Sequence, residues 1–310
     1  MAHKPPTRFS RPVRSTLRWL VPDQDVEQPL ESRGESRYLL CHARRLHDSL
    51  TRLPRGNGGG RCLVVGSWGL EVPYLAGELG WRDVTCVCAP DSDGRGRRQR
   101  CIRRHPNGDG AYEFTRIEFD IESGPWPFAD ASFDLAVFWG CFEHLRDDPE
   151  LALFELNRVC ASGATVSLIT DNAISLQATH GVIRGHPMPM RLHWPSSEGH
   201  WRLYTPNEIR DLLAGTGWRV DLLTSIVPDP PVYWKWWKRI LFKRLVADQR
   251  RGFGLAEPYW NAFVLAHAVK AAPPTRSYPG WLYKDEKIRQ LKVAMMEMLS
   301  DERAVAAASA

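Results

Sequence analysis

Short apolar runs alternate with segments of helical periodicity through most of the chain. Seven runs have the length and residue types of buried strands: 61–66, 83–89, 112–119, 133–139, 164–170, 218–226 and 261–269. A helix is predicted over 149–160, and Thr205-Pro206-Asn207-Glu208 predicts the start of another, with Thr205 as N-cap and Glu208 three residues later. Strands and helices in this alternation predict an α/β fold with a doubly wound, seven-stranded, mostly parallel sheet.

Changes in composition divide the chain into four segments. Basic residues among prolines and serines predict a disordered arm at the start, and the glycine-rich stretch 54–60 separates a predicted helix from the strands. The segments are a basic arm (1–34), a helix with a linker (35–60), a main domain (61–270) and a tail with a helix (271–310). Within the main domain, 173–204 and 227–252 are too long for ordinary connections, so we expect both to be insertions.

The strand predicted at 133–139 ends at Gly140, and an acid and an imidazole, Glu143 and His144, follow at once. Ligands of open α/β sheets bind beyond the carboxyl ends of the strands, so Glu143 and His144 are candidates for a site. An ordinary loop after a core strand is the alternative interpretation.

A polar, irregular stretch covers 91–110, and no strand is predicted there. Its six arginines are interpreted as a solvated face, with a patch for anionic ligands as the alternative: Arg95, Arg97, Arg98, Arg100, Arg103 and Arg104.

Composition narrows the class of protein. The 310 residues are 43% apolar and 25% charged with a net charge of +5, as in soluble globular proteins. No apolar run approaches the ~18 residues of a membrane-spanning helix, and no signal-peptide core is visible. Seven cysteines without a C-x-x-C pair favour a reducing, cytoplasmic compartment, and no metal site is predicted. The modest charge and the lack of a recognition fold argue against nucleic acid as a partner.

Four segments carry a family resemblance: WPFADASFDLAVFWGCFEHL (126–145), ELNRVCASGATVSLIT (155–170), DNAISL (171–176) and HWRLYTPNEIRDLLAGTGWRV (200–220). In this order and spacing they resemble the class I S-adenosylmethionine (SAM)-dependent methyltransferases, in the branch that modifies small molecules and glycans. The resemblance runs from about Arg61 to Lys270. It implies SAM as cofactor and a last strand that inserts antiparallel.

The resemblance also implies where the cofactor lies. Asp120 and Ile121 correspond to the residues that frame the adenine, but the glycine-rich motif after the first strand is degenerate. Trp68 and Leu70 replace its second and third glycines, and a missing Cβ is what normally lets the backbone approach a ligand. The cofactor-binding residues expected from these matches are Gly66, Ser67, Trp68, Gly69, Asp91, Asp120, Ile121, Trp139 and Glu143.

For three of these residues, more than one role is compatible with the sequence. Asp91 is considered for the ribose because Cys88 stands where the family has an acid at the end of the second strand. Trp68 and Trp139 would either stack on the ligand or fill the cleft.

Methyl transfer from a sulfonium needs a base only when the acceptor is a hydroxyl or a protonated amine, and imidazole suits that role near neutral pH. His144 is the first candidate by position and His200 the second, while Glu143 could orient a histidine or the cofactor ribose. The alternative for His144 is a purely structural role in its loop.

The two insertions bear on the acceptor. The first, 173–204, is interpreted as a lid or substrate wall. The second contains a predicted basic amphipathic helix at 232–250, rich in tryptophan, which either lies peripherally on a membrane or packs on the domain.

The sequence therefore predicts a SAM-dependent methyltransferase that acts on a small-molecule or glycan acceptor, with O-methylation preferred. If the chain contacts a membrane, a lipid-linked glycan is the expected acceptor. The alternative is a catalytically silent protein of the same fold that serves as a binding partner. A nicotinamide-dependent enzyme is disfavoured because no G-x-G-x-x-G follows the first strand.

Overall fold

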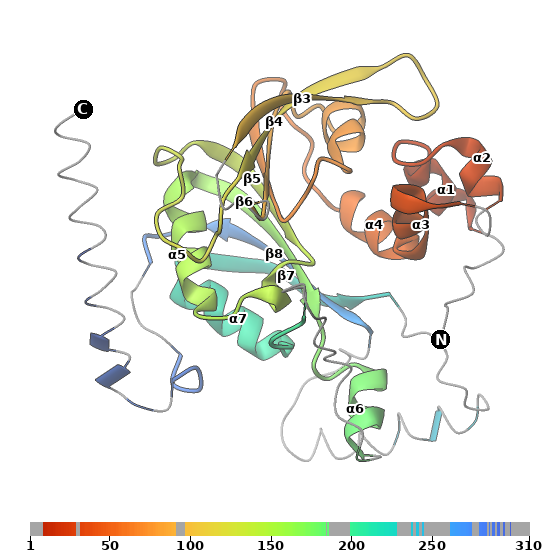
Figure 1. Cartoon of the computed structure of the whole chain (residues 1–310). Helices are drawn as coiled ribbons and strands as arrows, with labels where there is room; N and C mark the ends of the chain where they lie inside the picture. The colour runs from red at the N-terminus through yellow and green to blue at the C-terminus, as the bar shows by residue number, and fades with distance from the viewer. Residues whose placement is uncertain are drawn as a thin grey trace.

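The computed structural model describes residues 9–28, 32–90, 97–183, 185, 199–227, 261–274 and 279–283, with single positions within 237–244 and 285–298. Eight strands form one sheet in the order β3-β4-β2-β1-β5-β6-β8-β7 (Figure 1). They are β1 (Arg61–Val65), β2 (Asp83–Cys88), β3 (Arg98–Arg104), β4 (Ala111–Glu118), β5 (Phe133–Trp139), β6 (Cys160–Asp171), β7 (Trp218–Ile226) and β8 (Phe263–Lys270).

The predicted fold class is confirmed. Strands β4, β2, β1, β5 and β6 pair in parallel, and β8 runs antiparallel to both β6 and β7. The sheet has one strand more than the seven predicted.

The additional strand is β3, inside the stretch 91–110 that was predicted to be irregular. It pairs antiparallel with β4 at the edge of the sheet, and none of its residues is buried. Strand prediction relies on apolar residues, and an arginine-rich edge strand offers few. The arginines are paired in part, since Arg100 lies 2.7 Å from Glu113 of β4. Charged side chains on an edge strand also oppose pairing with another chain.

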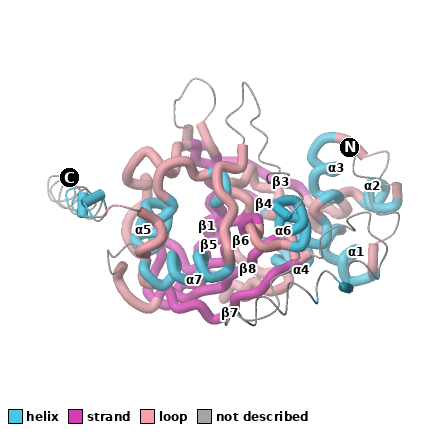
Figure 2. Tube along the Cα trace, turned by 90° about the horizontal axis from the view of Figure 1, so that it is seen from below, coloured by secondary structure: helices cyan, strands magenta, loops and turns pink. Residues whose placement is uncertain are grey.

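Both faces of the parallel sheet are buried. In β1, Leu63 and Val65 pack into a cluster with α5 (Pro149–Val159) and α7 (Pro206–Gly215). Cys62 and Val64 point to the other face and join a cluster with the N-terminal helices. Successive strand residues face opposite sides, which explains why the strands read as continuous apolar runs. Figure 2 shows α5 and α7 on one side of the strands and the N-terminal helices on the other.

Two N-terminal helices, α1 (Arg11–Leu17) and α2 (Asp23–Glu27), correct the prediction of a disordered arm over 1–34. The next two, α3 (Gly34–Cys41) and α4 (Ala43–Leu50), lie in the region where a helix was predicted. Val13, Leu17 and Val21 are buried, at a spacing of four residues that gives the basic segment an apolar stripe. Burial of this stripe against the sheet stabilises the folded segment. The composition of the segment alone did not indicate that stabilisation. Residues 1–8 and 29–31 lie outside the described part of the chain.

Two helices position the site. Helix α7 starts at the predicted capping box, in which the Thr205 side chain accepts from the Glu208 N–H and Glu208 from the Thr205 N–H. A short 3-10 helix, η2 (Phe142–His144), follows β5. Of the first insertion, the structure describes α6 (Leu176–Ile183) and 199–204; most of 227–252 lies outside the described residues. No described helix has the length and apolar character needed to cross a membrane.

Candidate active site

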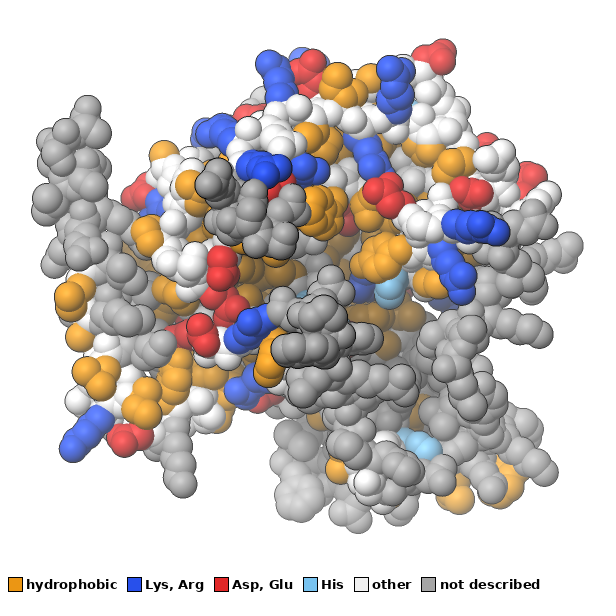
Figure 3. All heavy atoms as spheres, viewed as in Figure 1, with side chains coloured by type: hydrophobic (Ala, Val, Ile, Leu, Met, Phe, Trp, Pro, Cys, Tyr) orange, Lys and Arg blue, Asp and Glu red, His pale blue; other side chains and the backbone are white. Residues whose placement is uncertain are grey.

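Five parallel strands end at the same edge of the sheet, as expected where ligands bind in such folds. The last residues of these strands are Glu118 (β4), Cys88 (β2), Val65 (β1), Trp139 (β5) and Asp171 (β6). The predicted site residues that the structure describes follow or end these strands, with the exception of His200. Figure 3 shows a hollow in one face of the molecule, beside which hydrophobic and histidine side chains are visible.

The loop after β1 is packed against the protein itself. Gly66 and Gly69 have φ of +80° and +89°, values that L side chains rarely adopt. A Cβ on Gly66 would lie 2.6 Å from the Cβ of Cys141, and one on Gly69 would lie 2.5 Å from the Phe114 ring. The Ser67 hydroxyl donates to Glu71 and accepts from the Gly69 N–H at 3.0 Å. These two glycines are therefore required by close protein contacts, which the glycine-motif argument did not foresee.

The two tryptophans lie in different surroundings. The Trp139 indole donates from Nε1 to the Ser167 hydroxyl of β6 at 2.9 Å and packs against the core. Trp68 is 48% exposed, and the Arg116 guanidinium lies 5.2 Å from its ring. Trp139 is thus fixed within the sheet, whereas Trp68 keeps open surface at the site edge.

Of the acids considered for the cofactor, Asp120 is exposed and accepts from the Glu122 N–H at 2.9 Å. The Ile121 carbonyl accepts from the Trp126 indole at 3.1 Å, so this residue packs at the base of its turn. Asp91 lies outside the described residues.

A further carboxylate at this end of the sheet, Glu118, was missed from the sequence. It is 1% exposed, its carboxylate oxygens have no hydrogen-bond partner, and the Arg116 guanidinium lies 3.3 Å away. It pairs in register with Cys88, the position where an acid was sought. A buried carboxylate with free acceptor capacity is costly unless it binds something. The sequence signal was a lone acid ending a strand, two positions before the Asp120 that was chosen.

Beyond β5, Glu143 is 2% exposed. The Thr170 hydroxyl donates to its Oε2 at 3.0 Å. Burial, and then the nearby Asp171 carboxylate, raise the pKa of Glu143 to about 7.

His200 comes from the end of the first insertion and is held against β6. Its Nδ1 lies 2.7 Å from Oδ2 of Asp171, and this hydrogen bond raises the pKa of the imidazole. The backbone fixes the segment as well, because the Trp201 N–H donates to the Glu143 carbonyl at 2.8 Å and the Tyr204 N–H to the Asp171 carbonyl at 3.3 Å.

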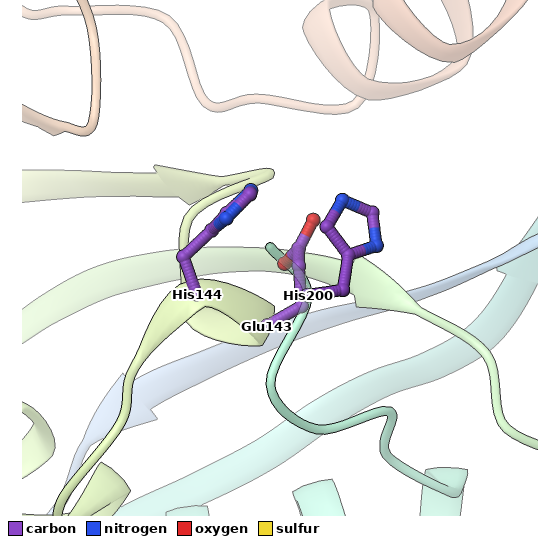
Figure 4. A group of neighbouring side chains, drawn as sticks. All are labelled: Glu143, His144 and His200. Atoms are coloured by element: carbon purple, nitrogen blue, oxygen red, sulfur yellow. The ribbon is translucent and has the colours of Figure 1, made fainter. Parts of the chain in front are cut away.

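The structure brings Glu143, His144 and His200 together. The two imidazole rings are 4.7 Å apart, centre to centre, at 87° to each other. Figure 4 shows the Glu143 carboxylate between the two rings. Asp171 and Thr170 complete the group and were not chosen from the sequence, although Asp171 begins the segment 171–176 that carries part of the family resemblance.

A positive charge lies beside this group. Arg45 of α4 reaches Gly140, where its Nη1 is 3.2 Å from the ideal Cβ position, and its Nη2 donates to the Tyr38 hydroxyl at 3.0 Å. Arg45 and Phe263 line a cavity of about 90 Å³ with residues of α3 and α4. This volume is small beside the ~300–1,000 Å³ of typical ligand pockets, so the cavity alone cannot hold an acceptor.

A family model described as a methyltransferase domain matches residues 40–223, more than half of the chain. The chain belongs to this methyltransferase family. None of the curated proteins searched matches it.

Solved structures with similar folds were also found. One is the complex between the Haloferax volcanii Trm112 methyltransferase activator and a methyltransferase, at 14% identity over 74% of this chain and 91% of that chain, with a TM-score of 0.47. A SAM-dependent methyltransferase from Thermotoga maritima matches at 17% identity over 80% of this chain and 97% of that chain, with a TM-score of 0.44. The [4+2]-cyclase SpnF matches at 15% identity over 74% and 81%, with a TM-score of 0.45. Identities this low do not carry an activity over to this methyltransferase.

S-adenosylmethionine is the cofactor of this methyltransferase. The residues at the β4 and β1 ends fit it. The unpartnered oxygens of Glu118 can accept from ribose hydroxyls, and the exposed face of Trp68 can pack against a ring. Glu118, Asp120 and Trp68 are the residues that would hold the adenosine portion.

Proposed function

We propose that this methyltransferase transfers a methyl group to a hydroxyl of a small-molecule or glycan acceptor. The observation that carries the proposal is the group formed by Glu143, His144 and His200, with Asp171 2.7 Å from His200. A hydroxyl must lose its proton as its oxygen becomes methylated, and this group supplies imidazoles and carboxylates for that purpose.

The reaction divides between the cofactor and the protein. When bound, SAM supplies a methyl carbon whose bond to sulfur breaks, with the electron pair kept by sulfur, as the acceptor oxygen bonds to that carbon. Asp171 accepts from Nδ1–H of His200, which fixes the ring and its tautomer and leaves the Nε2 lone pair available. Held in this geometry, the group draws the acceptor proton away as the oxygen attacks.

The position of the acceptor has indirect support. The candidate catalytic residues lie at the ends of β5 and β6. Glu118, whose carboxylate could accept hydrogen bonds from the cofactor ribose, lies at the end of β4. The edge of the sheet therefore has separate places for two ligands. The acceptor is proposed to lie at the β5–β6 end.

The first test is calorimetric titration of the purified chain with SAM and with S-adenosylhomocysteine. The expected result is saturable binding of one equivalent of each. Absence of binding at millimolar ligand contradicts the proposed function.

The second test follows S-adenosylhomocysteine formation by mass spectrometry with panels of hydroxylated and amine acceptors. Turnover with hydroxylated acceptors supports the proposal. Turnover with amines alone overturns O-methylation, and binding of SAM without turnover of any acceptor favours the silent alternative.

We propose in addition that 232–250 contacts a membrane surface, which would present a lipid-linked acceptor. In the described part of this segment, Trp237, Ile240 and Leu241 are helical and exposed, as an interfacial helix requires. Flotation of the full chain with anionic liposomes should exceed that of a chain lacking 232–250. Equal flotation of the two contradicts the membrane contact.

A further inference from the structure

The three side chains at the β5 end have the composition and spacing of a metal-binding site. Glu143, His144 and His200 each offer a ligand atom, and the three atoms lie within 4.8 Å of one another (Figure 4). We propose that these three residues bind one divalent transition-metal cation. The role of that cation in catalysis rests on the proposed function, whereas its binding does not.

The donor set selects the class of cation. Two imidazoles and one carboxylate suit Zn²⁺, Mn²⁺, Fe²⁺ or Co²⁺, while Mg²⁺ and Ca²⁺ prefer oxygen ligands throughout. Metal–ligand bonds of ~2.0–2.2 Å bring ligand atoms to ~3–4 Å from one another. The three atoms here are already near that separation, so small side-chain rotations complete the site.

Two of the three residues, His200 and Glu143, have the neighbours that metal ligands require. A ligating histidine usually donates its second ring N–H to a carboxylate, and Nδ1 of His200 does so to Asp171 at 2.7 Å. This leaves Nε2 for the cation. Ligating carboxylates are hydrogen-bonded in turn, and the Thr170 hydroxyl donates to Oε2 of Glu143 at 3.0 Å, which leaves Oε1.

The backbone holds the ligands in place although they lie more than fifty residues apart in sequence. Glu143 and His144 share one 3-10 turn, closed by the His144 N–H to the Cys141 carbonyl at 3.0 Å. The Trp201 N–H donates to the Glu143 carbonyl at 2.8 Å, which ties the turn to the segment that carries His200. The backbone that carries the three ligands is therefore in place before any cation binds.

The charges nearby also favour a cation. Glu143 and Asp171 are two carboxylates in close proximity, and burial of Glu143 makes an uncompensated charge costly. Arg45 is the opposing charge, and its guanidinium is shared with the Tyr38 hydroxyl and the Phe263 ring, 5.2 Å away. A cation held by Glu143, His144 and His200 would lie beside the buried Glu143 carboxylate and compensate its charge.

Three protein ligands leave coordination positions open, as in catalytic metal sites. An acceptor hydroxyl bound there becomes more acidic, because the cation stabilises the oxyanion. Its proton passes to solvent while the oxygen forms its bond to the methyl carbon. With Nε2 of His200 bound to the cation, the imidazole no longer accepts the acceptor proton, so in this inference the cation takes the place of the imidazole base of the proposed function.

The test uses the full chain, treated with EDTA and dialysed, without SAM or acceptor. Titration with Zn²⁺ and Mn²⁺ by calorimetry, and with Co²⁺ by visible absorption, should give one equivalent per chain. Glu143→Gln, His144→Ala and His200→Ala should each weaken binding by more than about 100-fold, and Asp171→Asn by about 10- to 100-fold. The matched control is His105→Ala, since His105 lies in the β3–β4 loop and accepts there from the Asn107 N–H at 3.0 Å.

Several outcomes overturn the inference. They are no binding of these cations at millimolar concentration, or full binding retained by any of the three ligand variants. A thiolate-to-cobalt charge-transfer band in the wild-type chain would also overturn it, by assigning the cation to a cysteine such as Cys141. This spectrum decides the matter even if a variant fails to fold. Metal binding without methyl transfer refutes only the proposed function, and methyl transfer without metal binding refutes only the cation.

Discussion

The edge of the sheet at which the parallel strands end has two halves that differ in structure. We call the β1 and β4 ends the cofactor half and the β5 and β6 ends the acceptor half. At the β1 and β4 ends, the loop after β1 is held by close apolar contacts, such as those of Gly66 with Cys141 and Gly69 with Phe114. At the β5 and β6 ends, ionisable side chains are held by hydrogen bonds between separate segments, as His200 is by Asp171. Close packing at two glycines distinguishes the first half, where Ser67 also accepts from the Gly69 N–H, and hydrogen bonds between separate segments distinguish the second.

This difference indicates which half of the edge carries the candidate catalytic groups of the methyltransferase. The degenerate glycine motif leaves the cofactor half with few polar groups, of which Glu118 is the most deeply buried. Glu143, His144 and His200 instead converge in the acceptor half. Substitutions in the acceptor half should therefore remove turnover while the fold persists, and substitutions in the cofactor loop should cost stability first.

The largest expected effect is that of His200→Ala. Loss of a group that handles the acceptor proton should lower kcat by about 10²- to 10⁴-fold. The dissociation constant of SAM and the melting temperature should change little, because His200 lies 37% exposed in the acceptor half. Steady-state kinetics and calorimetry measure both, with His105→Ala as control. Equal kcat values for the two variants would contradict the assignment of chemistry to this half.

Gly66→Ala tests the packing of the cofactor half. The new Cβ would lie 2.6 Å from the Cys141 Cβ at a φ of +80°, so we expect a loss of about 2–4 kcal/mol in the free energy of unfolding. Gly58→Ala is a matched control, since Gly58 has a φ of +83° with no atom within 4 Å of its ideal Cβ. It should show the backbone cost alone, about 1 kcal/mol. Urea denaturation of both decides, and equal losses would mean that the contact with Cys141 is unimportant.

A buried carboxylate on α5, outside both halves of the edge, provides a test of stability alone. Burial, and then Asp148, raise the pKa of Glu150 to about 9, and its carboxylate oxygens have no partner. The native state therefore keeps a proton that the unfolded chain releases above pH 4.5, so stability falls as pH rises from about 4.5 to 9. Glu150→Gln should match the wild type near pH 5 and exceed it by about 1–3 kcal/mol near pH 9.

The control for Glu150 lies on the same helix. Glu155 is also buried but is paired with Arg158 at 2.8 Å and accepts from the Trp126 N–H at 2.7 Å. Glu155→Gln should therefore destabilise the chain at both pH values. Parallel pH profiles of the wild type and Glu150→Gln would show that Glu150 is not an unpaired buried acid.

The sequence indicated the parts of this structure that local patterns determine. Apolar runs located β1, β2 and β5 because both sheet faces are buried, and the spacing of Thr205 and Glu208 located the start of α7. Strand β3 was missed because pairing at an exposed edge leaves no apolar pattern. Placement of His200 depends on backbone hydrogen bonds to Glu143 and Asp171, and no local pattern encodes such contacts.

The smallest expected effect is at Glu118, the buried carboxylate of the cofactor half. If its free oxygens accept from the cofactor ribose, Glu118→Gln should weaken SAM binding about tenfold, or ~1.4 kcal/mol, since the amide keeps one acceptor and loses the charge. Stability without ligand should rise, because a buried charge next to Arg116 alone is replaced by a neutral group. Glu113→Gln is a matched control on the same strand, with an exposed side chain paired to Arg100. Calorimetry with SAM and with Co²⁺ distinguishes the halves: weaker SAM binding with unchanged Co²⁺ binding supports the division, and a loss of both would show that the two halves are one coupled site.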